Sequence, residues 1–164
     1  MGTSEGVGIR GVRFDVPEGS ARKICKFYDV VFEARTEVLR MTTCVVKVGV
    51  EQVLEFKEQP GDVPPYDGHH VALYVNGDAF VRIYDQLFVR GLTYTNPRFP
   101  HLKSDSIVDA VENNEFRIKD IVDLDTFEGY GHPAVFELEH EVRSLLHPGF
   151  ALKGRLPRKA REEL

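Results

Sequence analysis

The chain has little of what marks several large classes of protein. Its 164 residues include two cysteines, Cys25 and Cys44, which are too few for a disulfide framework or for a zinc site of their own. No run approaches the roughly 18 apolar residues of a membrane-spanning helix, and the short, polar N-terminus carries no hydrophobic signal region. These absences predict a cytoplasmic protein with no membrane partner, whose cysteines are buried, inert thiols in a reducing compartment.

Basic residues are outnumbered by acidic ones, at 21 against 26. The formal net charge is -5 and the isoelectric point is about 5.7, which argues against a nucleic-acid partner because phosphate binding needs a basic face. Lysines and arginines gather in the segment 153–161, so the rest of the chain is more acidic than this total suggests. The sequence also lacks a phosphate-binding glycine loop, a dinucleotide fingerprint and the nucleophile elbow of hydrolases.

A pattern of extended and helical segments occurs twice in the same order. Apolar residues alternate with other residues near 11–16 and again near 70–75, which predicts two strands with one buried face each. Each strand precedes an amphipathic helix, the first with Ser20 and the second with Asp78 as its N-cap. The other predicted strands lie at about 36–42, 44–48 and 51–57 in the first half, and at about 92–96, 115–123 and 134–141 in the second.

This order predicts an α+β fold made of two β-α-β-β-β modules. The modules span residues 8–59 and 66–148, and a linker rich in proline and glycine joins them at 60–65. A basic C-terminal tail follows at 149–164. The loop near 100–113 is long enough to cover a site, although irregular loops serve more often as plain connections.

Strand alternation gives the duplicated sheet two different faces. The apolar side chains suit the helices, and the other face carries Gly11, Arg13, Glu55, Lys57, His70, Ala72, Tyr74, Glu137 and Glu139. Two related modules packed about a pseudo-twofold axis would bring Glu55 and its match Glu137 toward His70, the residue matched with Gly11. Two carboxylates and an imidazole are donors that suit a divalent metal ion.

The order of these motifs resembles the vicinal oxygen chelate superfamily, which includes glyoxalase I, extradiol dioxygenases, methylmalonyl-CoA epimerase and fosfomycin- or bleomycin-resistance proteins. The resemblance covers about residues 8–141 and is carried by Gly11 to Pro17, Phe27-Tyr28, Val53-Leu54-Glu55-Phe56, Gly68-His69-His70-Val71-Ala72-Leu73 and Val135-Phe136-Glu137-Leu138. It implies a curled mixed sheet around a central cleft, with metal ligands at Glu55, His70 and Glu137. The fourth ligand position of the family is Gly11 here, and glycine has no donor.

The resemblance implies an enzyme as the first of two functions. This enzyme would be a divalent-metal-dependent lyase or isomerase acting on a small carbonyl-containing substrate, with Zn, Ni, Mn, Co or Fe as the Lewis acid. Glu137 or Glu55 would be the catalytic base. A dioxygenase matches less well, because extradiol enzymes have histidine at the position of Gly11.

The alternative is a metal-free protein that binds or sequesters a small molecule in the same cleft. Arg13, Lys57 and Tyr74 would then contact the ligand, and the two basic residues would neutralise the glutamates. In either case the family implies a homodimer.

Three neighbours of the implied ligands have other predicted roles. His69 should point away from His70 by strand parity and lie at the surface or in a cap. Glu139 shares the face of Glu137 and is predicted either to support the ligands or to lie at the rim of the cleft. His140 falls on the side of the helices, where a structural histidine is expected.

Overall fold

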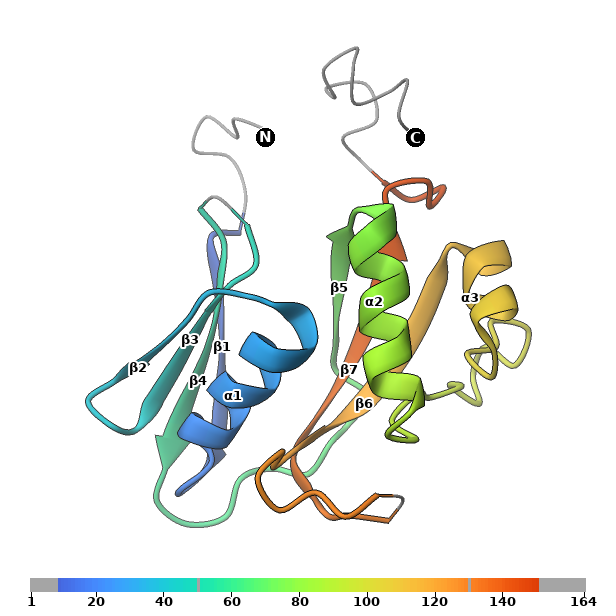
Figure 1. The fold of residues 1–164 in the computed structure, drawn as a ribbon. Coiled ribbons are helices and arrows are strands. Elements are labelled where there is room, and N and C mark those ends of the chain that lie inside the picture. The colour runs from blue at the N-terminus through green and yellow to red at the C-terminus, as the bar shows by residue number, and fades with distance from the viewer. Residues whose placement is uncertain (1–8, 50, 130, 151–164) are drawn as a thin grey trace.

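Two β-sheets, one from each repeat, form the framework of the molecule (Figure 1). The computed structural model describes residues 9–49, 51–129 and 131–150, so most of the predicted tail lies outside the described residues. The first repeat forms β1 (Gly11–Pro17), α1 (Ala21–Phe32), β2 (Thr36–Leu39), β3 (Thr43–Lys47) and β4 (Val53–Gln59). The second repeat forms β5 (His70–Val75), α2 (Gly77–Phe88), α3 (Ile107–Asn113), β6 (Glu115–Val122) and β7 (Ala134–Ser144).

The strand order confirms the predicted α+β class. In the N-terminal sheet the order is β1-β4-β3-β2, with β1 parallel to β4 and the other pairs antiparallel. In the C-terminal sheet the order is β5-β7-β6, with β5 parallel to β7 and β6 antiparallel to it. Both sheets are therefore mixed, and within the described residues neither closes into a barrel.

The predicted strand at 92–96 is the main difference from the expected topology. Within the described residues this segment forms a single bridge, between Thr93 and Ile118. Pro97 follows the segment and Pro100 comes three residues later, and neither can donate a hydrogen bond to a sheet ladder, so the segment does not continue along β6 as a strand. The chain then forms α3 within the predicted loop before it enters β6. The C-terminal sheet consequently has three strands where four were predicted.

The two longer helices begin close to their predicted positions but are capped differently. The side chain of Asn76, two residues before the predicted cap Asp78, accepts a hydrogen bond of 2.8 Å from an N–H in the first turn of α2. Helix α1 begins after Ser20 as predicted, but the Ser20 hydroxyl donates back to a carbonyl of β1. Glu58 of β4 instead accepts from the first N–H of α1 at 2.8 Å, which fixes this helix to the N-terminal sheet.

Helix α1 also packs on the C-terminal sheet and so joins the two repeats. It contacts β2, β3 and β4 of its own repeat and α2, β6 and β7 of the other (Figure 1). At this junction the Tyr28 hydroxyl lies 2.6 Å from Nε2 of His140 on β7, and both side chains are fully buried. The ring of Phe32 stacks on the imidazole at 5.7 Å. His140 is thus the structural histidine that strand parity predicts.

The hydrogen bonds of His140 fix its tautomer. Nδ1 lies 2.7 Å from the Leu138 carbonyl, which can only accept, so Nδ1 carries the proton. Nε2 is then the acceptor for the Tyr28 hydroxyl. Burial away from water lowers the pKa of His140 to about 4, so the imidazole is neutral at physiological pH.

Cys25 on α1 and Cys44 on β3 form a disulfide, so the prediction of two free thiols is wrong, although both residues are buried as expected. Their separation of 19 residues does not reveal the pairing, because only the packing of α1 on β3 brings the two Cα atoms to 5.6 Å. The disulfide removes the ground on which a reducing compartment was predicted. No helix among the described residues is long and apolar enough to cross a membrane.

Candidate functional site

The polar face of the N-terminal sheet holds Glu55, one of the three predicted metal ligands. Its neighbour in the register is Arg13 on β1, and Arg13 Nε lies 2.7 Å from Glu55 Oε1. Lys57, half-buried, follows Glu55 on the same face of β4. Because a guanidinium already balances this carboxylate, Glu55 is not a free anionic donor.

The second predicted ligand, Glu137 on β7, forms an ion pair with Lys119 of β6. The hydrogen bond from the ammonium to Glu137 raises the pKa of Lys119. The same ammonium lies 5.7 Å from the centre of the Tyr66 ring. Glu137 is therefore neutralised, and its partner is Lys119 instead of the predicted Lys57.

The third predicted ligand, His70, lies at the start of the edge strand β5. Its side chain is 52% exposed, and Nε2 is 3.7 Å from Oε1 of Glu141 on β7. Glu141 itself is almost fully buried among arginines, with 7% of its side chain exposed. His70 thus lies at the edge of a charged cluster, and its nearest carboxylate is not one of the predicted ligands.

The strand registers also change which residues of the two repeats correspond. The residue two beyond Gly11 lies opposite Glu55, and the residue two beyond His70 lies opposite Glu141. When Gly11 and His70 are matched, the counterpart of Glu55 is therefore Glu141. The predicted counterpart Glu137 is wrong, since it lies four residues earlier on β7.

These placements do not suit a divalent ion at the predicted ligands. In the part of the chain that the structure describes, no three His, Cys, Asp or Glu side chains are arranged to hold a metal ion. Glu55 and Glu137 each have a cationic partner, so an ion would have to displace a guanidinium or an ammonium group. The donor set that the resemblance implies is therefore dispersed over two sheets.

Tyr74, predicted to contact a ligand, instead holds the end of the described chain. Its hydroxyl donates to the Gly149 carbonyl at 2.9 Å and accepts from Arg143 at 3.1 Å. The residue lies on β5 of the C-terminal sheet, whereas Arg13 and Lys57 lie on the N-terminal sheet. The three predicted ligand contacts therefore do not share one sheet.

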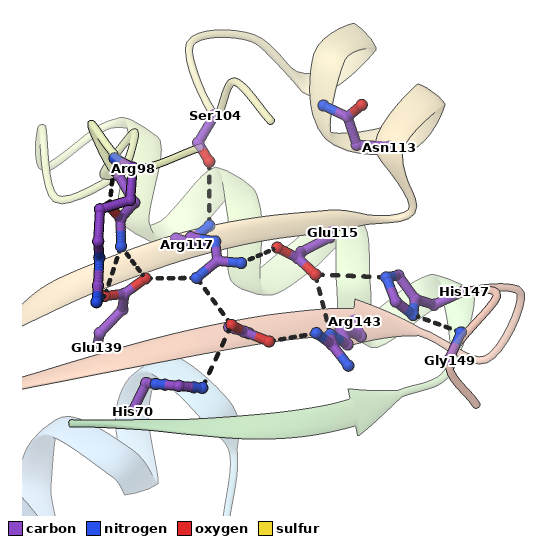
Figure 2. A network of polar contacts seen from close by, with 12 residues as sticks. His70, Arg98, Ser104, Asn113, Glu115, Arg117, Glu139, Arg143, His147 and Gly149 are labelled. Carbon is purple, nitrogen blue, oxygen red and sulfur yellow. Dashed lines mark hydrogen bonds and ion pairs between the residues drawn. The ribbon is translucent and has the colours of Figure 1, made fainter. Parts of the chain in front are cut away.

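The polar face of the C-terminal sheet is occupied by a buried cluster, which we call the ion network. It consists of Glu115 and Arg117 on β6 and Glu139, Glu141 and Arg143 on β7. Figure 2 shows Arg117 at its centre, between Glu115 and Glu139. The side chains of all three carboxylates are less than one-tenth exposed, so their charges are balanced within the protein and not by water.

Glu139 is the most enclosed member of the ion network, with none of its side chain exposed. Asn96 donates to its two oxygens at 2.8 and 2.9 Å, and the Tyr66 hydroxyl donates at 2.7 Å. Burial opposes ionisation, but these hydrogen bonds and that of Arg117 outweigh it and lower the carboxyl pKa. Of the two positions predicted for Glu139, the one at the rim of the cleft is therefore wrong, because the side chain is fully buried.

A groove of about 380 Å³ lies where the linker crosses the start of β7. We call it the linker groove; its lining residues are Pro17, Val63, Pro64, Pro65, Tyr66, Ala134, Val135, Phe136 and Glu137. Apart from Glu137 and the Tyr66 hydroxyl, the side chains that line it are apolar. It thus combines an apolar wall with one charged end, where Lys119 meets Glu137.

Aromatic rings from both repeats meet behind this groove. The Phe136 ring lies 6.2 Å from Phe14, from Phe56 and from His69. His69 points away from His70 as predicted, and its Nδ1 is 2.8 Å from a carboxylate oxygen of Asp67. The imidazole therefore packs among apolar rings while its polar edge is satisfied.

Sequence reasoning missed the basic partners of these carboxylates. Arg117 and Lys119 lie in a segment that was interpreted only as a strand, yet they alternate with Glu115 as residues of one face must. Glu139, Glu141 and Arg143 show the same alternation. This alternation of charged residues could have predicted that they share one face of the sheet. Which carboxylate pairs with which basic residue depends on the register of β6 against β7.

Comparison with known proteins supports the fold and no more. No protein-family profile and no curated protein matches the chain. Several solved structures do, at identities low enough that the likeness concerns the fold alone. The chain has a glyoxalase-like fold, as the resemblance of its motifs implied.

Three of these solved structures illustrate the match. A structure described as a possible glyoxalase from Bacillus cereus has a TM-score of 0.54 and 14% identity, covering 84% of this chain and 98% of that one. Oxidase ChaP-H2 has a TM-score of 0.56 and 13% identity, covering 89% and 99%. Oxidase ChaP-H1 has a TM-score of 0.51 and 20% identity, covering 84% and 96%.

Proposed function

We propose that this protein binds a small organic molecule in the linker groove and needs no metal ion to do so. The carrying observation is the groove itself, which is lined mostly by apolar side chains and ends in the Glu137–Lys119 ion pair. Its volume of about 380 Å³ falls in the range of small-molecule sites. Of the two functions that the sequence implies, the geometry favours the metal-free binding protein.

The lining indicates the chemistry of the ligand. Proline rings, Val135 and Phe136 offer contact surface for a flat, apolar body, and the Tyr66 ring borders the same space. The ammonium of Lys119 at the charged end has three N–H donors, so it can bind a carboxylate or sulfonate while it stays paired with Glu137. We therefore infer an aromatic or alicyclic ligand with one anionic group.

The pairing of the predicted ligands weighs against the metal-dependent lyase or isomerase. In such an enzyme Glu55 or Glu137 would have to bind the metal ion or act as the base without a cationic partner. Each is paired with a cation here. Their ion partners lie on different sheets, so one substrate would not release both. The Arg13–Glu55 and Lys119–Glu137 pairs support the metal-free protein, because they balance the charges of these carboxylates before a ligand binds.

Fluorescence titration with anilinonaphthalene sulfonate, an aromatic anion, tests the groove. We expect saturable binding to the native protein and binding at least about tenfold weaker in Val135→Trp, which fills the groove, and in Lys119→Met, which removes the cation. Phe88→Ala removes a ring on α2 that is 50% exposed and does not line the groove; this variant should bind the probe like the native protein and controls for binding to exposed rings elsewhere. Equal affinity in Val135→Trp and the native protein would rule out the groove as the site.

A chelation experiment tests the metal-free part of the proposal. Protein treated with ethylenediaminetetraacetate and then dialysed should bind the probe with unchanged affinity, and adding Zn²⁺ or Mn²⁺ should not alter it. Loss of binding on chelation, restored by one equivalent of metal, would contradict the proposal and favour the lyase or isomerase.

We also propose that the chain forms a homodimer through its edge strands. Among the described residues, β1 and β5 each pair on one side only, with β4 and β7 respectively. Gly11, Val12 and Arg13 at the start of β1 are exposed, and an exposed strand edge is a template for another chain. Sedimentation should give a dimer that Val12→Lys dissociates, and a monomeric native protein at all concentrations would contradict this.

A further inference from the structure

A second hollow, which we call the loop pocket, lies between the start of α1 and the loop that joins β6 to β7. Its volume is about 330 Å³, which falls in the range of small-molecule sites. Figure 1 shows this loop, in orange, at the same end of the molecule as the linker. The polar residues that line the loop pocket are Glu18, Ser20, Lys23, Asp123, Thr126 and His132. The loop pocket is therefore more polar than the linker groove.

Asp123 connects the loop to helix α1. Its carboxylate accepts the N–H of Asp125, two residues further on, at 3.0 Å, and this Asx turn starts the loop. The other carboxylate oxygen of Asp123 lies 3.2 Å from Nζ of Lys23 on α1, and the side chain is only 10% exposed. A second ion pair, between Lys26 and Asp125, also joins the helix to the loop but does not line the loop pocket. The pocket wall is thus built from two elements that are far apart in the sequence.

The lining of the loop pocket offers hydrogen-bond donors and acceptors side by side. Lys23 and Asp123 balance each other in charge, so the pair gives little preference for a further ionic group. The ammonium still has N–H donors to spare, and the carboxylate has free acceptor positions. The Thr126 hydroxyl, which can both donate and accept, lies 3.4 Å from Nε2 of His132. Neighbouring hydroxyl groups of a sugar also donate and accept side by side, so this lining suits a sugar.

The loop pocket and the linker groove share one wall. Pro17, Ala134 and Val135 line both of them. Along β7 the shared residues come first, and Glu137 follows three residues after Ala134, which is about 10 Å in an extended strand. The Glu137–Lys119 ion pair therefore lies at the end of the linker groove that is remote from the loop pocket. One molecule that crosses the shared wall would have its anionic group at one end and its polar group at the other.

We infer that the loop pocket binds the sugar of an aromatic glycoside, whose ring lies in the linker groove and whose anionic group meets Lys119. This inference rests on the proposed function of the linker groove and adds to it the class of ligand. The sugar hydroxyls accept from Lys23 and donate to Asp123, with Thr126 beside them. Hydrogen bonds to charged groups such as these are stronger than those between neutral groups. An aromatic acid without the sugar makes none of them and therefore binds more weakly.

Isothermal titration calorimetry of the full chain with two matched probes tests this inference. Para-methoxybenzoate carries the ring and the carboxylate, and para-carboxyphenyl glucoside has glucose in place of the methyl group. Native protein should bind the glucoside at least about tenfold more tightly. In Lys23→Met and in Thr126→Val this preference should fall below about threefold, because each change removes hydrogen bonds to the sugar, while the affinity for para-methoxybenzoate stays native. Lys26→Met removes the ammonium of the neighbouring ion pair; it is the matched control and should keep the preference.

Two results would overturn the inference. One is a native protein with equal affinity for the two probes; the other is a preference for the glucoside that persists in both Lys23→Met and Thr126→Val. Native affinity for para-methoxybenzoate shows that a variant is folded, and if one of the two variants loses this affinity, the other variant decides. A native protein that binds neither probe contradicts the proposed function, whereas one that binds both equally refutes the sugar subsite alone. The two proposals therefore fail separately.

Discussion

The junction between α1 and β7 predicts that the protein loses stability at mildly acidic pH. His140 is fully buried, and its pKa is about 4 in the folded protein against 6.5 for an accessible imidazole. The unfolded chain therefore binds more protons than the folded one between these two pH values. Stability that is present above about pH 6.5 is lost progressively as the pH falls toward 4.

The structure also sets the size of this effect. The difference between the two pKa values corresponds to about 3 kcal/mol at the acid limit and to about 2 kcal/mol at pH 5. Protonation is opposed because Nε2 accepts the hydrogen bond of the Tyr28 hydroxyl at 2.6 Å. A second proton on the ring would force this buried hydroxyl to rotate and lose its acceptor.

Urea unfolding of the native protein and of His140→Gln at about pH 7.5 and 5 measures the effect. Glutamine does not titrate, and the carboxylates common to both proteins cancel in the comparison. The free energy of unfolding of the native protein should fall by about 2 kcal/mol more than that of His140→Gln over this range. A difference between the two proteins that is the same at both pH values, within about 0.5 kcal/mol, would refute the reasoning.

Three further changes have defined outcomes. Replacing Glu139 by Gln leaves guanidinium groups without a counter-charge in a buried place and should lower the free energy of unfolding by about 3 kcal/mol in chemical denaturation. Replacing both Cys25 and Cys44 by serine removes a crosslink with a sequence separation of 19 residues and should lower it by about 3 kcal/mol, which reduction of the native protein should reproduce. Asn76→Ala should lower the free energy of unfolding by about 1 kcal/mol, because it removes the N-cap of α2. Ser20→Ala should leave the cap of α1 intact, since Ser20 makes no side-chain cap hydrogen bond. Equal losses at the two positions would contradict this.

The sequence pattern predicts most of the fold because alternation and helical spacing reflect burial directly. The strand starting at Gly11 and the one starting at His70 both lie where period-two patterns predict them. The segment 92–96 has the same apolar alternation but is followed by Pro97 and, three residues later, by Pro100, and the local pattern does not take such neighbours into account.

The candidate site was less predictable because it depends on distances between strands. The motifs predict that Glu55, His70 and Glu137 bind one metal ion together. In the structure each has a different partner, because the register of the strands sets which side chains meet. A shift by an even number of residues, such as the four residues between Glu137 and Glu141, keeps a side chain on its face and changes every contact that it makes. The two cysteines show the same limit, since nothing local indicates that α1 lies on β3.

The position of α1 has a consequence for how the two repeats relate. A duplicated chain often consists of interchangeable parts, but this helix is covalently tied to one sheet by Cys25 and hydrogen-bonded to the other by Tyr28. Neither repeat could be excised or exchanged without exposing the aromatic face of the helix or the imidazole beneath it. The two repeats therefore form one cooperative unit that should unfold in a single transition.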